Sequence, residues 1–137
     1  MTTHAALALQ AAVIEALRAD AALTALLGGP RVHDQAPPRT RPPYVTVGEH
    51  TTRAWDTFTR RGHEHFLTLH AFSEQGGRRE AWQIITRMDE VLDDAGLTLD
   101  GHHLVNLRSI FWTVMPGRRG RLHQGILRLR ATTQPLD

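Results

Sequence analysis

The stretch Glu64-His65-Phe66-Leu67-Thr68-Leu69-His70-Ala71-Phe72 decides the fold class, together with the segment that follows it. Apolar residues recur at every second position at Leu67, Leu69 and Ala71, which is the period of a strand. Beyond Gly76-Gly77 they recur at helical spacing, at Ala81, Ile84, Ile85, Met88, Val91 and Leu92. A strand that continues directly into a helix packed on the same sheet is typical of a small α+β domain.

The composition is that of an ordinary globular protein. The 137 residues, 41% of them apolar and 22% charged, indicate a single domain over residues 1–137 with its own core. The absence of cysteine excludes disulfides, zinc-thiolate sites and thiol catalysis. No apolar run approaches the roughly 20 residues that a membrane span needs, so we expect no membrane partner. The N-terminus has no signal-peptide pattern, so we expect the cytoplasm as the site of synthesis and assembly.

The charge balance is less basic than the pI suggests. All 16 basic residues are arginine, which raises the pI to about 10.3 although the formal net charge is only +2. An alanine-rich chain whose only strong bases are arginines is also what a GC-rich genome encodes. Composition therefore leaves a small basic nucleic-acid-binding module as an alternative function rather than the leading one.

The N-terminal third predicts helical structure and then an extended connection. Thr3 is a suitable N-cap for a first helix, and Asp20 is a suitable cap for a short continuation over residues 21–27 that stops at Gly28-Gly29. The proline-rich segment 31–43 predicts an extended connection, and a strand is expected over residues 44–49.

The C-terminal third predicts a three-stranded meander. Asp100-Gly101 separates two apolar alternations, 97–99 and 102–105, and this is a strong hairpin signal. The second of these strands continues to about residue 114, and a last strand covers residues 122–132. The predicted order is helix, strand, strand, helix and meander, with two helices packed on one face of a mostly antiparallel sheet.

A long connection at about residues 51–62 joins the first two strands. It is too long for a tight hairpin, and Trp55 and Phe58 lie in it among threonines and arginines without a clear period. We interpret it as either a mobile loop or two extended hairpin arms. Long loops inside compact domains are more often functional than accidental.

The strands are apolar on both faces. If Leu67 and Leu69 face the helices, then Phe66, Thr68, His70 and Phe72 occupy the opposite face. Alternation in the next long strand places Val105, Leu107 and Phe111 on one face and Leu104, Ile110, Trp112 and Val114 on the other. Helices cover only one face of such a sheet, so the other face is expected to be buried against another subunit, or else under loops or the proline-rich segment.

Several segments in order along the chain resemble the tail-completion, or tail terminator, proteins of long-tailed phages, prophages and gene transfer agents. The resembling residues are Leu9 to Ala12, Leu17 to Leu23, Gly28-Gly29, Pro43-Tyr44-Val45, Gly62 to His65, Leu67 to His70, Gly76 to Ala81, Leu99 to His102 and His123 to Ala131. Together they span nearly the whole chain, and the specificity lies in their order and spacing.

This resemblance implies a structural role. Family members form a hexameric ring that caps the finished tail tube and contacts the head-neck complex. The expected partners are therefore other copies of the chain, the major tail tube protein and a neck adaptor or stopper, with DNA passing through the lumen without sequence recognition. The expected location is the tail-neck junction of the virion or phage-like particle, after assembly in the bacterial cytoplasm. Our candidate interface residues are Trp55, Phe58, Arg60, Arg61, Phe66, Phe72, Trp112, Arg128 and Arg130.

Histidines raise the question of a metal site. His63 and His65 point the same way on a strand, His70 has the opposite parity, and His102 and His103 could lie nearby. Carboxylates are not spaced as additional ligands, so surface or interface histidines are the preferred interpretation. We expect no bound metal and no cofactor.

Catalytic motifs are also missing from the sequence. Neither serine, Ser73 or Ser109, lies in a nucleophile elbow, and Gly76-Gly77-Arg78 lacks the ending of a phosphate-binding loop. We therefore expect no enzymatic activity.

Arginines form the last candidate group. Arg118, Arg119 and Arg121 belong to a predicted turn, and Arg128 and Arg130 alternate with Leu127 and Leu129. They could line a DNA path, but an inter-subunit or solvated role is preferred because no recognition helix or stacking platform accompanies them.

Overall fold

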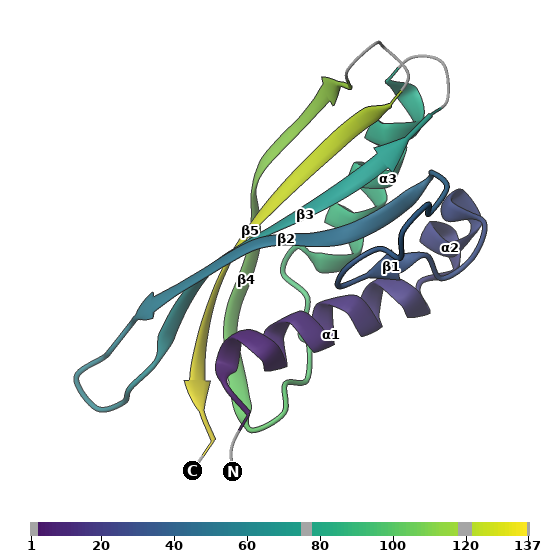
Figure 1. Cartoon of the computed structure of the whole chain (residues 1–137). Coiled ribbons are helices and arrows are strands. Elements are labelled where there is room, and N and C mark those ends of the chain that lie inside the picture. The colour runs from purple at the N-terminus through teal and green to yellow at the C-terminus, as the bar shows by residue number, and fades with distance from the viewer. Residues whose placement is uncertain (1–2, 75–77, 118–121, 137) are drawn as a thin grey trace.

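A mostly antiparallel sheet and three helices make up the computed structural model, which describes residues 3–74, 78–117 and 122–136 (Figure 1). The helices are α1 (Ala5–Ala19), α2 (Ala21–Leu27) and α3 (Arg79–Leu92). The strands are β1 (Val32–His33), β2 (Tyr44–Ala54), β3 (His63–Ser73), β4 (His102–Pro116) and β5 (His123–Pro135). The sheet order is β1-β2-β3-β5-β4, with β1 parallel to β2 and every other pair antiparallel.

The α+β class and the mostly antiparallel sheet are confirmed, but the helical count differs from the prediction. Residues 21–27 form a separate helix because Asp20 caps it, accepting a hydrogen bond from the Leu23 amide at 2.9 Å. The first helix is capped by His4 rather than by Thr3, since His4 Nδ1 accepts from the Ala6 amide at 3.0 Å. The Thr3 hydroxyl instead donates to Asp100 at 3.0 Å.

The predicted strand over residues 97–99 is wrong. The segment makes a single bridge, between Leu99 and His102, and continues no ladder. Leu99 is buried in the core and Leu97 packs against it, so their alternation reflects core filling rather than strand pairing. The proline-rich connection, in turn, contains a strand that the sequence pattern did not predict, where Val32 and His33 pair with Val45 and Thr46.

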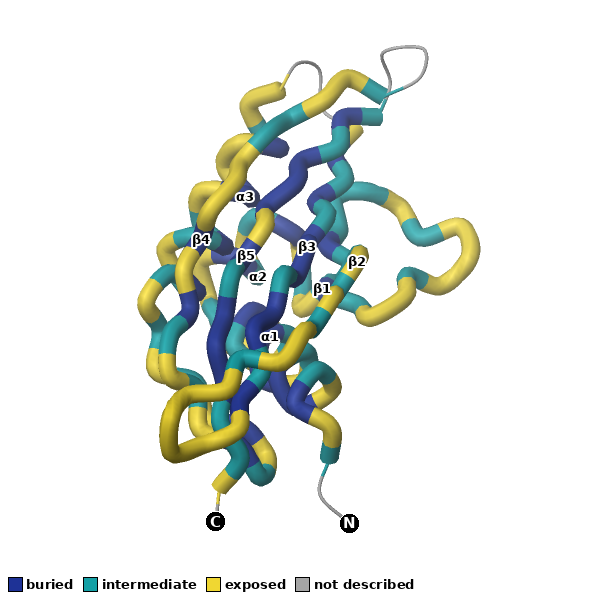
Figure 2. The backbone as a smooth tube through the Cα atoms, turned by 90° about the vertical axis from the view of Figure 1, so that its left-hand side faces the viewer, coloured by how far each residue is buried: buried dark blue, intermediate teal, exposed yellow. Residues whose placement is uncertain are grey.

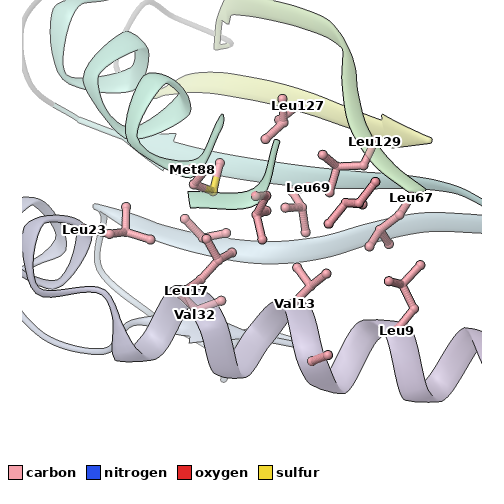
Figure 3. Close-up of a cluster of buried hydrophobic side chains, with 14 of the residues drawn as sticks. Leu9, Val13, Leu17, Leu23, Val32, Leu67, Leu69, Met88, Leu127 and Leu129 are labelled. Carbon is pink, nitrogen blue, oxygen red and sulfur yellow. The ribbon is translucent and has the colours of Figure 1, made fainter. Parts of the chain in front are cut away.

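The core lies between the helices and one face of the sheet (Figure 3). Leu9, Val13 and Leu17 of α1 point toward the sheet, and Leu67, Leu69, Leu127 and Leu129 are among the strand residues of the same core. The third helix packs on this same face, because a Cβ placed on Gly125 of β5 would lie 2.8 Å from Ile85 Cγ1. The interior alternation predicted for β3 is therefore present in the structure, with Leu67, Leu69 and Ala71 fully buried.

Alternation along β4 is interrupted by two register shifts, between Leu104 and Asn106 and between Ser109 and Phe111. Leu107 pairs with the core residue Ala131, whereas Phe111 pairs with Arg128. Strand partners share a face of the sheet, so Leu107 and Phe111 lie on opposite faces. The predicted grouping of these two residues is wrong because each bulge adds one residue and reverses the parity that follows it.

The predicted connection at about residues 51–62 is shorter than expected, because β2 continues to Ala54. Residues 55–62 extend this hairpin as two arms (Figure 1). The Trp55 amide donates to the Gly62 carbonyl at 2.9 Å, and the Thr57 amide donates to the Arg60 carbonyl at 2.8 Å. Gly62 is required by space, because a Cβ there would lie 2.6 Å from the Trp55 carbonyl oxygen and 2.7 Å from that of Thr133. We refer to residues 55–62 as the hairpin tip.

Candidate subunit interface

The sheet face turned away from the helices, here called the open face, is the candidate interface (Figure 2). Strand register places on it Tyr44, Thr46, Thr51 and Arg53 of β2, Glu64, Phe66, Thr68, His70 and Phe72 of β3, Gln124, Ile126, Arg128, Arg130 and Thr132 of β5, and Asn106, Arg108, Phe111, Thr113 and Met115 of β4. No helix in the described parts of the chain covers this face. It combines aromatic side chains with arginines.

Glu64 lies at the centre of the charge arrangement on the open face. Its carboxylate is paired with Arg53 on one side and with Arg130 on the other, where the Arg130 Nη2 atom lies 2.6 Å from Glu64 Oε2. Only 7% of the Glu64 side chain is exposed. The hydrogen bonds from Arg53 and then Arg130 lower the pKa of Glu64 below its usual value, so the carboxylate stays ionised.

Arginines also stack on aromatic rings of this face. The Arg128 guanidinium lies over the Phe111 ring at 4.9 Å, and that of Arg53 lies over Phe66 at 5.8 Å. Phe111 and Met115 remain about two-fifths exposed, at 40% and 41%. A planar cation above an exposed ring leaves both groups available to a neighbouring protein surface.

A second partly exposed apolar group follows the outer strand β4. Val105, Ile110, Phe111, Trp112 and Met115 are all exposed by 40% or more. Near its middle this strand is covered by the connection after α3, where the Asp94 amide donates to the Leu107 carbonyl and Asp93 accepts from the Ser109 amide. Residues 110–116 lie beyond these contacts, at the edge of the sheet.

The predicted interface residues do not form one cluster. Phe66, Phe72, Arg128 and Arg130 lie together on the open face, whereas Trp112 pairs with Leu127 and therefore lies on the helix-bearing face. The other four belong to the hairpin tip, and they are Trp55, Phe58, Arg60 and Arg61. Phe58 is fully exposed, and Arg60 donates to the Pro135 carbonyl at 2.9 Å. Arg118, Arg119 and Arg121 lie outside the described residues.

Sequence reasoning missed Glu64, Arg53 and Phe111 as members of this face. Alternation alone puts Glu64 on the same side as Phe66, so this residue could have been found. Arg53 and Phe111 could not, because register shifts in β2 and β4 precede them.

Removing the charge of Glu64 tests the arrangement. We expect Glu64→Gln to lower the stability of the fold, because two guanidinium groups then face one neutral amide. The paired carboxylate contributes folding stability above its ordinary pKa, and this contribution is lost as the pH falls from that value toward the lowered pKa of the folded state. Because glutamine does not titrate, the stability of the variant should fall less with acid. Urea unfolding measures both effects.

Arg53→Gln is the matched control, because the Arg53 side chain is 72% exposed and Arg130 still pairs with Glu64, so this variant should lose less stability than Glu64→Gln. Equal losses in the two variants would contradict the central role of Glu64.

The histidines of β3 lie on both faces of the sheet. His63 and His65 lie on the helix-bearing face and His70 on the open face, as their parity predicts. Within residues 3–74, 78–117 and 122–136, no group of three or more histidines and carboxylates is placed to hold a metal ion.

Sequence comparison assigns the family. The model of a family described as "Tail completion protein gp17" matches residues 11–134, which is most of the chain. This protein belongs to the tail completion protein gp17 family. Among curated proteins, no sequence matches significantly.

Structural comparison agrees with the family. One similar chain belongs to a solved structure described as "Virion of native gene transfer agent (GTA) particle". It is 28% identical, with a TM-score of 0.87, and the match covers 96% of this chain and 99% of that chain. This tail completion family member is therefore a phage-tail structural protein of virion assembly. No helix in the described residues is long and apolar enough to cross a membrane.

Proposed function

We propose that this protein is a tail terminator. In this proposal, copies of the chain form a ring of six that caps the tail tube, joins it to the head-neck complex and lets DNA pass through its lumen. The family membership and the similarity to a gene transfer agent virion chain support a place in the tail. A structural role of this kind needs no catalytic group.

The observation that favours a ring is the apolar surface along β4. Five large hydrophobic side chains remain partly exposed within residues 105–115, and two of them, Phe111 and Met115, lie on the open face, where Arg128 stacks on Phe111. Exposed apolar patches of this kind mark protein interfaces. The helix-bearing side offers a different surface, so contact between the two sides of adjacent copies is heterologous and closes into a ring when the rotation permits.

In this proposal the hairpin tip makes a second contact, along the tail axis. It extends beyond the sheet and carries an exposed aromatic ring, Phe58, next to two arginines, Arg60 and Arg61 (Figure 1). Aromatic and arginine side chains are enriched in protein interfaces. This tip fits a contact with the tube or with the neck protein.

The alternative of a nucleic-acid-binding module has less support. Arg53 and Arg130 are paired with Glu64, and Arg108 is paired with Asp93 at 2.9 Å. Arg128 stacks on Phe111. Arginines that neutralise carboxylates within the chain contribute less to phosphate binding.

Removal of the gene from a particle-producing strain tests the proposal. We expect DNA-filled heads without attached tails, and tails of abnormal length, when the particles are viewed by electron microscopy. Restoring the wild-type gene should restore both features. Deletion particles with tails of normal length that are attached to heads would contradict the proposal. Wild-type particles with a single copy at the tail end instead of a ring would also contradict it.

A further inference from the structure

A cluster of histidines joins the start of α1 to the sheet. It comprises His4 at the cap of α1, His50 of β2, His63 and His65 of β3, and His102 of β4. The ring centroids of His4 and His63 are 5.2 Å apart, those of His50 and His65 are 5.1 Å apart, and those of His63 and His65 are 6.1 Å apart. Sequence alternation identified His63 and His65 but gave no indication of His50.

Four side chains of this region form a continuous hydrogen-bonded chain. Gln10 Nε2 lies 2.9 Å from His50 Nδ1, His50 Nε2 lies 2.9 Å from His65 Nδ1, and His65 Nε2 lies 2.9 Å from Thr133 Oγ1. An amide nitrogen only donates, so His50 accepts at Nδ1 and donates from Nε2. The same assignment then holds for His65, and both rings are neutral with the proton on Nε2.

Three polar or ring contacts join residues 3–10 to the sheet, in addition to the apolar packing of Leu9. Gln10 reaches β2 through His50, the Thr3 carbonyl accepts from His102 Nε2 at 2.7 Å, and His4 packs against His63. Each of the three contacts includes a histidine. A change in their protonation therefore acts on the N-terminal half of α1, and α3 at the other end of the core has no such contact among those described.

The surroundings oppose a positive charge in the cluster. His65 is fully buried, and burial followed by the neighbouring His50, His63, His4 and His102 lowers its pKa to about 3. Burial and His4 likewise lower the pKa of His50. Asp56 is the carboxylate that favours protonation here, and it acts on His63, whose pKa is nevertheless lowered by burial. The Nδ1 atoms of His63 and His102 are buried without a hydrogen-bond partner.

We propose that Gln10, His50, His65 and Thr133 form an acid-sensitive latch, which holds the N-terminal half of α1 on the sheet while the two imidazoles are neutral. A proton added to His65 Nδ1 faces the N–H of His50, so the two rings present donors to each other. The hydrogen bonds can form in the opposite direction only if His50 changes tautomer and the Gln10 amide turns over. The latch is a property of the single chain and does not depend on the proposed ring.

The direction of the pH effect follows from linkage. A histidine whose pKa is lowered by folding contributes stability that is present above its ordinary pKa of 6.5 and is lost as the pH falls toward the folded value. At about pH 5, a shift of this size at His65 alone raises the equilibrium constant for opening roughly 30-fold over that at about pH 8.

Hydrogen exchange of the full chain, corrected for intrinsic rates, tests the latch at about pH 8 and about pH 5. We expect the opening constant of α1 amides over residues 8–13 to rise at least tenfold with acid, and that of α3 amides over residues 84–88 to change little. His65→Gln keeps an acceptor and a donor but cannot titrate, so it should lose most of the acid response. His103→Gln changes an exposed histidine and should respond as the wild type does.

Nitrogen-detected NMR of the wild type gives a second readout that needs no variant. We expect His65 to remain neutral, with the proton on Nε2, at about pH 6. A charged His65 at that pH, an equal acid response in α1 and α3, or a full response in His65→Gln would overturn the proposal.

Discussion

The double variant Phe111→Ser, Arg128→Glu is expected to fold as a normal monomer and to fail in particle assembly. Both side chains lie on the open face, and the guanidinium of Arg128 rests on the Phe111 ring at 4.9 Å. Arg128 is exposed and Phe111 is 40% exposed, so we expect the variant to lose some stability and to remain folded. Loss of an aromatic and arginine pair from an interface costs about 2 kcal/mol, which weakens one contact roughly 30-fold.

The loss is repeated at each contact of a closed ring, so its effect on assembly is compounded. Circular dichroism and urea unfolding of the purified variant report on the fold, and electron microscopy with a DNA-delivery assay reports on particles. Arg41→Glu, in the proline-rich connection, is the charge-matched control and should assemble normally. Wild-type particle yield from the double variant would show that this part of the open face makes no essential contact.

Arg130 is unsuitable for the same experiment, although alternation along β5 treats it like Arg128. The structure pairs Arg130 with the buried carboxylate of Glu64. Arg130→Glu would place two carboxylates in contact, and a loss of assembly could then come from a damaged fold.

Leu69→Ala is expected to have the largest effect on the fold itself. Leu69 is fully buried in β3, where it pairs with Val47 and Leu127 beneath the helices (Figure 3). Truncation of such a side chain removes its burial free energy and leaves a cavity, which together cost about 2–5 kcal/mol. That is a large fraction of the roughly 5–15 kcal/mol that stabilises a typical domain.

Urea unfolding of the purified variant measures this loss. Leu7→Ala is the matched control, because Leu7 lies on α1 with 61% of its surface exposed and should change stability by less than about 0.5 kcal/mol. Similar losses in the two variants would contradict the placement of the core between the helices and β3.

Local apolar periodicity determined the fold class of this protein. The change of period after Phe72 predicts a strand and then a helix, and β3 and α3 are both present. Alternation in β3 also separated Leu67 and Leu69 from Phe66 and Phe72, because no bulge interrupts its pairing with β5. A regular backbone period is a property of neighbouring residues, so the sequence contains it.

Tertiary contacts determined the strand faces and side-chain pairs that local periodicity does not predict. Bulges in β2 and β4 reverse the parity after them, which brought Arg53 and Phe111 to the open face. Leu97 and Leu99 alternate like a strand, but Leu99 lies in the core and Leu97 packs against it. Two polar arrangements join residues that are far apart in sequence: the pairing of Glu64 with Arg53 and Arg130, and the hydrogen-bonded series from Gln10 to Thr133. Only the packing of α1, β2, β3 and β5 brings their atoms within hydrogen-bonding distance.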